Sequence, residues 1–132
     1  MNIPEGKDLR GANFEGANFQ KANFQDVNLY GANLINVNLE EGNLKGANLM
    51  KADLFGANLK KADLRKANCE SAYLMKTNLE EANLEGANLK LADLREAKEG
   101  LINNFKFSLW ELLYNSISPN NPQRKYLSLI HI

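Results

Sequence analysis

The 132-residue sequence has very few of the residues that build reactive or cross-linked sites. It contains one cysteine, Cys69, and one histidine, His131. A single cysteine excludes an intrachain disulfide, and one histidine cannot assemble a metal or catalytic cluster. No nucleophile is paired with a base, and no glycine-rich phosphate loop is present. We therefore expect no catalytic residue, no cofactor and no metal ligand, and we expect that the chain is not an enzyme.

The chain also lacks net charge and long apolar runs. Sixteen Lys and Arg residues balance sixteen Asp and Glu residues, so no electrostatic field steers the protein toward nucleic acid or an anionic membrane. No apolar stretch approaches the length of a membrane span. The first six residues have neither the basic nor the apolar region of a secretory signal. We expect no nucleic-acid or membrane partner and a cytoplasmic location.

What the sequence does contain is a repeat of five residues. A large apolar residue, or Cys69, recurs at every fifth position from Leu9 to Leu94. We call this the central position. From Ala12 on, the residue two before it is small and mostly alanine. The residue directly before it is Asn or Asp except at Tyr73, and the two residues after it are mostly polar, charged or glycine. A period of five fits neither the 3.6 of a helix nor the 2 of a strand, and it predicts short extended pieces separated by turns.

Units such as Ala12–Gly16, Ala47–Lys51 and Ala52–Gly56 resemble the A(D/N)LXX motif of the pentapeptide-repeat family. The resemblance covers eighteen units in register, from Lys7 to Glu96. It implies an all-β solenoid: a right-handed quadrilateral β-helix in which four units form one coil, with about four and a half coils over residues 1–96. Central and small residues would point inward and the others outward. The family is most familiar from bacteria.

If four units form a coil, residues twenty apart stack on one another. One row of outward positions then alternates in charge from coil to coil, and it holds Gln20-Lys21, Glu40-Glu41, Lys60-Lys61 and Glu80-Glu81. Stacked opposite charges stabilise neighbouring strands by about 0.2–1 kcal/mol each. We interpret this row as structural and solvated.

Two neighbouring rows instead gather apolar side chains on the outside of the tube. We call these residues the apolar zone: Tyr30, Ile35, Met50, Phe55 and Met75. A contiguous exposed apolar patch often marks a protein interface, whereas single apolar residues scattered on a surface are common. Both interpretations stay open. The five residues are the candidates for binding an unknown protein partner, and Tyr73 places an aromatic side chain outside beside them.

Two predictions concern the interior. Phe14, Phe19 and Phe24 fill three of the four central positions of the first coil, and bulky aromatics there would close its open end. Cys69 takes a central position between Leu49 and Leu89, which favours a small buried hydrophobic residue over a redox role.

The C-terminal part predicts a helical cap over residues 97–118, because the open end of a solenoid exposes strand edges and core. Ser108–Glu111 matches a capping box and predicts a helix from about Leu109 to Ser116, before Pro119. One apolar side of this helix can cover the last coil. The other side carries Phe107, Trp110 and Tyr114. That side either folds onto the cap as well or meets a partner: a second copy in a homodimer, another protein or a further domain.

Residues 119–132 are interpreted as a linker or tail beginning at a turn, Asn120-Asn121-Pro122. The last six residues, 127–132, resemble an in-frame translation of a transposase adapter end used in sequencing libraries, and we interpret them as an artefact. The natural chain would then continue beyond about Tyr126. The alternative is a genuine apolar tail that packs on the cap.

Three functional hypotheses follow. The first is a non-catalytic structural or protein-interaction module that presents a rigid surface. The second comes from the resemblance, because some pentapeptide-repeat proteins mimic duplex DNA and bind type II topoisomerases. The range from Lys7 to Glu96, however, contains twelve basic and thirteen acidic residues, so its net charge is far from that of an acidic DNA mimic. The third is an accessory domain of a longer enzyme or signalling protein, whose active domain would lie beyond this sequence.

Overall fold

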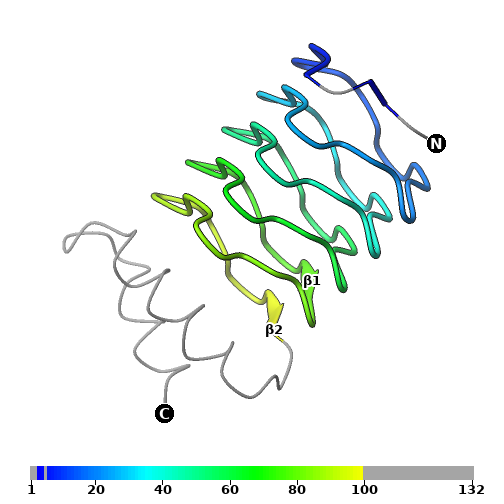
Figure 1. Cartoon of the computed structure of the whole chain (residues 1–132). Coiled ribbons are helices and arrows are strands. Elements are labelled where there is room, and N and C mark those ends of the chain that lie inside the picture. Colours follow the sequence, from blue (N-terminus) through cyan, green and yellow to red (C-terminus); the bar gives the residue numbers. More distant parts are fainter. Residues whose placement is uncertain (1–2, 5, 100–132) are drawn as a thin grey trace.

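A computed structural model describes residues 3–4 and 6–99 of the chain. These residues form a stack of similar coils that runs from the blue N-terminal end to the yellow coil at the other end (Figure 1). Parallel β-bridges join residues twenty apart, beginning with Asp8 and Asn28. Each coil therefore takes four five-residue units and has four sides.

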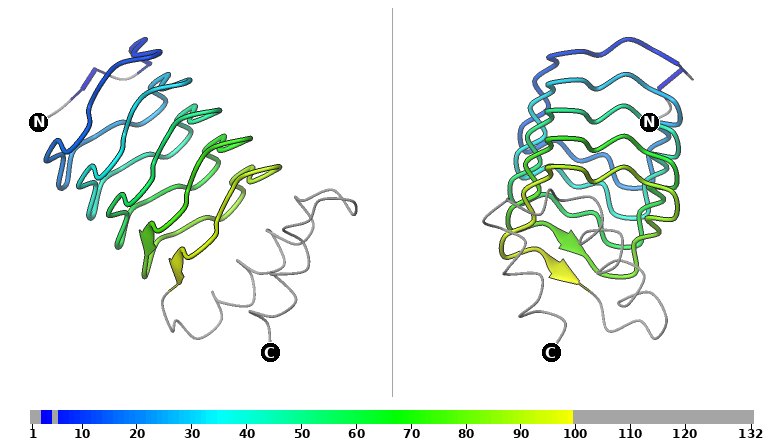
Figure 2. Two further views of the ribbon diagram at one scale, coloured as in Figure 1. Left: turned by 180° about the vertical axis from the view of Figure 1, so that it is seen from behind. Right: turned by 90° about the vertical axis from the view of Figure 1, so that its left-hand side faces the viewer.

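Regular strands are very short. Strand β1 (Asn78–Leu79) pairs in parallel with β2 (Lys98–Glu99), and Asn78 lies opposite Lys98. The two strands occupy the same place in successive coils (Figure 2). The ladder thus continues past residue 96, where we expected the repeat to end. None of the described residues forms a helix long and apolar enough to cross a bilayer.

The same backbone hydrogen bonds hold each side of the coil to the next coil. On one side, the amide of Leu54 donates to the carbonyl of Tyr73 (2.8 Å), and the amide of Tyr73 donates to the carbonyl of Ala52 (2.9 Å). At the following turn, the amide of Gly56 donates to the carbonyl of Met75 (2.9 Å). Because these bonds use backbone atoms alone, the outward side chains are free to vary.

The two residues after each central position form a turn at a corner of the coil. The carbonyl of Leu49, for example, accepts a hydrogen bond from the amide of Ala52 (3.0 Å) across its turn. The second turn residue has positive φ in unit after unit, as a type II turn requires. Twelve of these residues are not glycine, and their φ values lie between 54° and 60°. The Asn or Asp before the centre supports the turn: Asn48 Oδ1 accepts a hydrogen bond from the amide of Met50 (3.1 Å).

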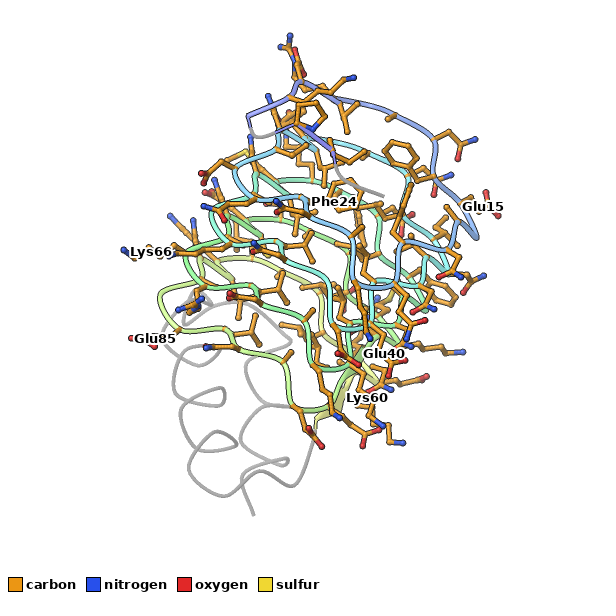
Figure 3. All side chains as sticks on the ribbon, turned by 45° about the vertical axis from the view of Figure 1, so that its right-hand side comes forward. Glu15, Phe24, Glu40, Lys60, Lys66 and Glu85 are labelled. Atoms are coloured by element: carbon orange, nitrogen blue, oxygen red, sulfur yellow. The ribbon has the colours of Figure 1, made fainter. Side chains whose placement is uncertain are left out.

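The core lies inside the coils and consists of the central and small residues. The aromatic cluster expected at the N-terminal end is present. The rings of Phe14 and Phe19 and those of Phe19 and Phe24 meet edge to face, with centroids 5.1 Å apart in both pairs. Phe24 is fully buried, whereas Phe14 at the open end is half-buried. Figure 3 shows Phe24 among the side chains inside the stack. Edge-to-face contacts stabilise aromatic pairs beyond the burial of their area.

Cys69 is buried among these central residues, as predicted, and its side chain is 1% exposed. Burial raises the pKa of the Cys69 thiol to about 12. The reactive thiolate is therefore almost absent at neutral pH, which agrees with a structural role.

The predicted cap over 97–118 lies outside the described residues beyond Glu99. The same holds for the tail over 119–132 and for the candidate contacts Phe107, Trp110 and Tyr114. The helical cap and the homodimer therefore stay predictions.

Candidate functional site

The outward turn residues form four corners of the coil. Corner 1 holds residues 10–11, 30–31, 50–51, 70–71 and 90–91, and corner 2 holds residues 15–16, 35–36, 55–56, 75–76 and 95–96. Corner 3 holds residues 20–21, 40–41, 60–61 and 80–81, and corner 4 holds residues 25–26, 45–46, 65–66 and 85–86. The side between corners 1 and 2 carries residue 73 and its stacked equivalents.

The apolar zone lies on corners 1 and 2. Tyr30 and Met50 stack on corner 1, while Ile35, Phe55 and Met75 stack on corner 2. Tyr30 is 36% exposed, and the other four side chains are half-buried. The register therefore brings the five candidates to adjacent corners, and their role in binding stays a prediction.

Tyr73 adds a sixth side chain to this face. It takes the place of Asn or Asp on the side between the two corners and is 49% exposed, the largest value for a big apolar or aromatic residue among those described. Its bridge partners are Asp53 and Asp93 in the coils before and after. We did not include Tyr73 among the candidates from sequence, although its departure from the Asn/Asp pattern marked it.

Two lysines lie over the aromatic rings of the apolar zone. Lys51 Nζ is 5.9 Å from the ring centroid of Tyr30, and Lys76 Nζ is 5.6 Å from that of Phe55. Ammonium groups at this range are attracted to the ring face, and the lysine stems cover apolar surface. This arrangement agrees with the half-burial of Phe55.

A shallow hollow of about 150 Å³ opens at the end of corner 2, lined by Phe55, Met75, Lys76, Arg95 and Glu96. Lys76 Nζ lies 3.7 Å from a carboxylate oxygen of Glu96, and Arg95 Nη2 lies 3.1 Å from Met75 Sδ. The hollow thus has an apolar floor and a rim on which opposite charges are paired.

Corners 3 and 4 have a different chemistry. On corner 3, Lys61 Nζ lies 3.9 Å from Glu81, and Lys98 Nζ lies 2.8 Å from Glu80. The hydrogen bond from Lys98 holds the pKa of the Glu80 carboxyl below its usual value. Figure 3 shows Glu40 and Lys60 together at this part of the surface.

A wider hollow of about 290 Å³ lies along corner 4. Its lining residues are Lys45, Arg65, Lys66, Glu85 and Gly86. Both signs of charge are represented, and Figure 3 shows Lys66 and Glu85 at this edge. Mixed charges around an open hollow give no field of one sign that would hold an anion or a cation.

Aspartates at the Asn/Asp position form a local ion pair that sequence reasoning missed. Arg65 Nε donates to Asp63 Oδ1 (2.9 Å), and Arg65 Nη2 donates to Asp63 Oδ2 (2.6 Å). This fork lowers the pKa of Asp63, chiefly through the side-chain hydrogen bond. Arg10 and Arg95 bind Asp8 and Asp93 in the same way. The available signal was that arginine follows two residues after these aspartates.

The described residues contain no group of three or more His, Cys, Asp or Glu side chains that could hold a metal ion.

Comparison with known proteins identifies the repeat. A model of pentapeptide repeats matches eight copies over residues 6–34, 32–68 and 72–98. The chain belongs to the pentapeptide-repeat family. Its members form right-handed quadrilateral β-helices, which agrees with the four-sided coil. The family model does not match residues 69–71, where Cys69 replaces leucine. The ladder of backbone hydrogen bonds is nevertheless continuous there, because the amide of Cys69 donates to the carbonyl of Asn88 (2.7 Å).

Solved structures of pentapeptide-repeat proteins resemble the chain. Protein alr5209 of Nostoc is 36% identical over 80% of this chain and 83% of its own, with a TM-score of 0.68. HetL of Nostoc, which is involved in heterocyst differentiation regulation, is 31% identical over 70% of this chain and 59% of its own (TM-score 0.33). AT2G44920 of the Arabidopsis thylakoid lumen is 28% identical over 95% of this chain and 90% of its own (TM-score 0.34). None of the curated protein sequences compared with the chain matches it.

Proposed function

We propose that this pentapeptide-repeat protein is a non-catalytic interaction module that binds a partner protein through the face between corners 1 and 2. The observation that carries the proposal is the gathering of apolar and aromatic side chains on this face. Tyr30 and Tyr73 are its exposed anchors, and Phe55 and Met75 floor the adjoining hollow. Elsewhere the outward positions hold mostly charged or amide side chains.

The chemistry of the face supports this role. Aromatic residues and methionine are enriched in the centres of protein interfaces, whereas lysine and glutamate are depleted there and common at the rim. Here Lys51, Lys76 and Glu96 surround the apolar residues, with their charges over rings or in ion pairs. A partner can therefore cover the apolar side chains while the rim charges stay in water.

The test is the double substitution Phe55→Lys and Met75→Lys. Both side chains point outward, so the variant should keep the wild-type circular dichroism spectrum and unfold close to the wild-type midpoint. It should lose the partner, with affinity falling at least about thirtyfold, because even one buried interface anchor contributes about 2 kcal/mol or more. The partner would be captured from the source organism, purified, and titrated by calorimetry.

The matched control is the double substitution Gln20→Lys and Gln25→Lys, which adds the same two positive charges. It introduces two lysines at the same kind of turn position, but on corners 3 and 4. The control should bind the partner as the wild-type protein does. Wild-type affinity in the Phe55→Lys and Met75→Lys variant would remove the proposal.

A DNA mimic that binds a type II topoisomerase remains the alternative that the family suggests. A DNA mimic needs a continuous acidic surface, and this surface does not favour that role because basic residues lie on corners 3 and 4: Lys60, Lys61, Arg65 and Lys66. Inhibition of topoisomerase supercoiling by the purified protein would support the alternative, and full supercoiling activity would dismiss it.

A further inference from the structure

In this repeat, arginine stands two residues after aspartate in three units and never two residues after asparagine. The position before the centre holds Asp four times and Asn thirteen times. The three units with arginine two residues later are Asp8-Leu9-Arg10, Asp63-Leu64-Arg65 and Asp93-Leu94-Arg95. No asparagine of the repeat has an arginine at that place. Each aspartate of these three units is held by the forked guanidinium of its own unit.

The fourth aspartate, Asp53, breaks this rule. Two residues after it stands Phe55 in place of arginine. Asp53 Oδ1 accepts a hydrogen bond from the amide of Phe55 (3.1 Å), as in the ordinary turn. No described residue forms an ion pair with the Asp53 carboxylate. The geometry that binds a guanidinium elsewhere is thus built here without the guanidinium.

The surroundings of Asp53 suit a guanidinium from outside. In the next coil Tyr73 is the bridge partner of Asp53, so their side chains leave the same side of the tube one above the other. Tyr73 is 49% exposed and offers a ring face on which a planar guanidinium can stack. The nearby ammonium of Lys76 is matched by Glu96 at 3.7 Å, which limits its repulsion of an incoming cation.

We propose that Asp53 and Tyr73 form a docking point for an arginine side chain of the partner protein. The proposal rests on the proposed function and names the partner group that the face binds. Arginine fits better than lysine because it can bind both carboxylate oxygens and stack on the ring at once. The partner's arginine would take the place that Arg65 takes beside Asp63.

The first test uses a blocked Gly-Arg-Gly tripeptide as the probe and blocked Gly-Lys-Gly as the comparison. Both are titrated into the isotope-labelled full chain and followed by NMR. We expect saturable shifts at the amides of Asp53, Phe55 and Tyr73, with the arginine peptide binding more tightly. Equal binding of the lysine peptide, or shifts spread evenly over the surface, would overturn the proposal.

Two substitutions distinguish bidentate binding to the Asp53 carboxylate from general repulsion by an added positive charge. In Phe55→Arg, the new guanidinium should bind the Asp53 carboxylate as Arg65 binds that of Asp63. This variant should therefore abolish binding of the arginine peptide. Asn36→Arg adds the same charge to the same corner, but no aspartate stands two residues before it, so it should leave most of the binding intact. Equal losses in both variants would show that charge repulsion alone acts, and would refute the docking point.

Asp53→Asn removes the charge while keeping the turn, since asparagine is the usual residue at this position. Once a partner is identified, this variant should weaken its binding about tenfold and leave the unfolding midpoint close to wild type. If Asp53→Asn binds normally while Phe55→Lys with Met75→Lys does not, the interaction face stands and the arginine site falls. If both variants bind normally, the proposed function falls as well.

Discussion

Corners 2 and 3 share one backbone and differ in almost every side chain. The amide of Gly56 bonds the carbonyl of Met75 at 2.9 Å on corner 2, and the amide of Lys61 bonds the carbonyl of Glu80 at 2.8 Å on corner 3. On corner 2 an ammonium lies over an aromatic ring, whereas on corner 3 Lys61 pairs with Glu81. Inward residues and backbone therefore determine this fold, while outward residues are available for function.

The two sides of the tube would not be equivalent if the core residues of one side contributed most of the free energy of unfolding. Leu54 lies on the side between corners 1 and 2, Leu59 lies on the side between corners 2 and 3, and both are fully buried. We expect Leu54→Ala and Leu59→Ala to lower the free energy of unfolding by similar amounts, about 2–5 kcal/mol each. Chemical denaturation measures both. A loss at only one of the two sites would contradict the equivalence of the sides.

Glycines at the corners have different surroundings in different coils. Gly31 and Gly56 both have positive φ, but a Cβ on Gly31 would meet no neighbouring atom within 4 Å, whereas a Cβ on Gly56 would collide with Asn36 Oδ1. Gly31→Ala should lower the free energy of unfolding by about 1 kcal/mol, through backbone strain alone. Gly56→Ala should lower it by about 1–2 kcal/mol, slightly more than Gly31→Ala, because the exposed Asn36 side chain must also turn away from the added methyl.

Asn36→Ala supplies the control for this steric argument. In a double-mutant cycle, truncating Asn36 should remove the excess cost of Gly56→Ala and leave the cost of Gly31→Ala unchanged. Additive effects in both pairs would mean that the collision does not decide the cost.

The smallest expected effect concerns acid stability. Arg65 holds the pKa of Asp63 below its usual value, so the pair stabilises the fold fully above the unfolded carboxyl pKa of about 3.9. That contribution is lost as pH falls through the lower folded pKa. Arg65→Met should therefore shift the midpoint of acid unfolding slightly upward, and its stability difference from wild type should vanish at the lowest pH. A difference that persists there would point to packing of the arginine stem instead.

Much of this architecture was predictable because the repeat is regular. A period of five, with inward positions set by Leu and Ala, determines that residues such as Asn38 and Asn58 stack twenty apart. The same register placed Phe55 and Met75 on one corner and Cys69 in the core. These predictions need only sequence separation, since every coil uses the same backbone bonds.

Other features depend on side-chain conformation, which the register does not determine. The positions of Lys51 and Lys76 over the aromatic rings follow from rotamers and local electrostatics. The fork between Asp63 and Arg65 lies within a single unit, so a search for residues that stack between coils passes over it. Tyr73 was recognised as an exception, but its exposure depends on how far its ring extends beyond Asp53 and Asp93.

The twenty-residue stacking also makes the surface sensitive to the length of the chain. Loss of one five-residue unit would turn everything after it by a quarter revolution around the tube axis, although every backbone bond could form again. If the lost unit lay between Phe55 and Met75, Met75 would leave the corner of Phe55 and stand above a different row. A gain or loss of four units would lengthen or shorten the tube without this rotation. The number of units modulo four therefore determines the angle at which each outward residue lies, so the fold can survive a change in repeat number that disrupts the proposed binding face.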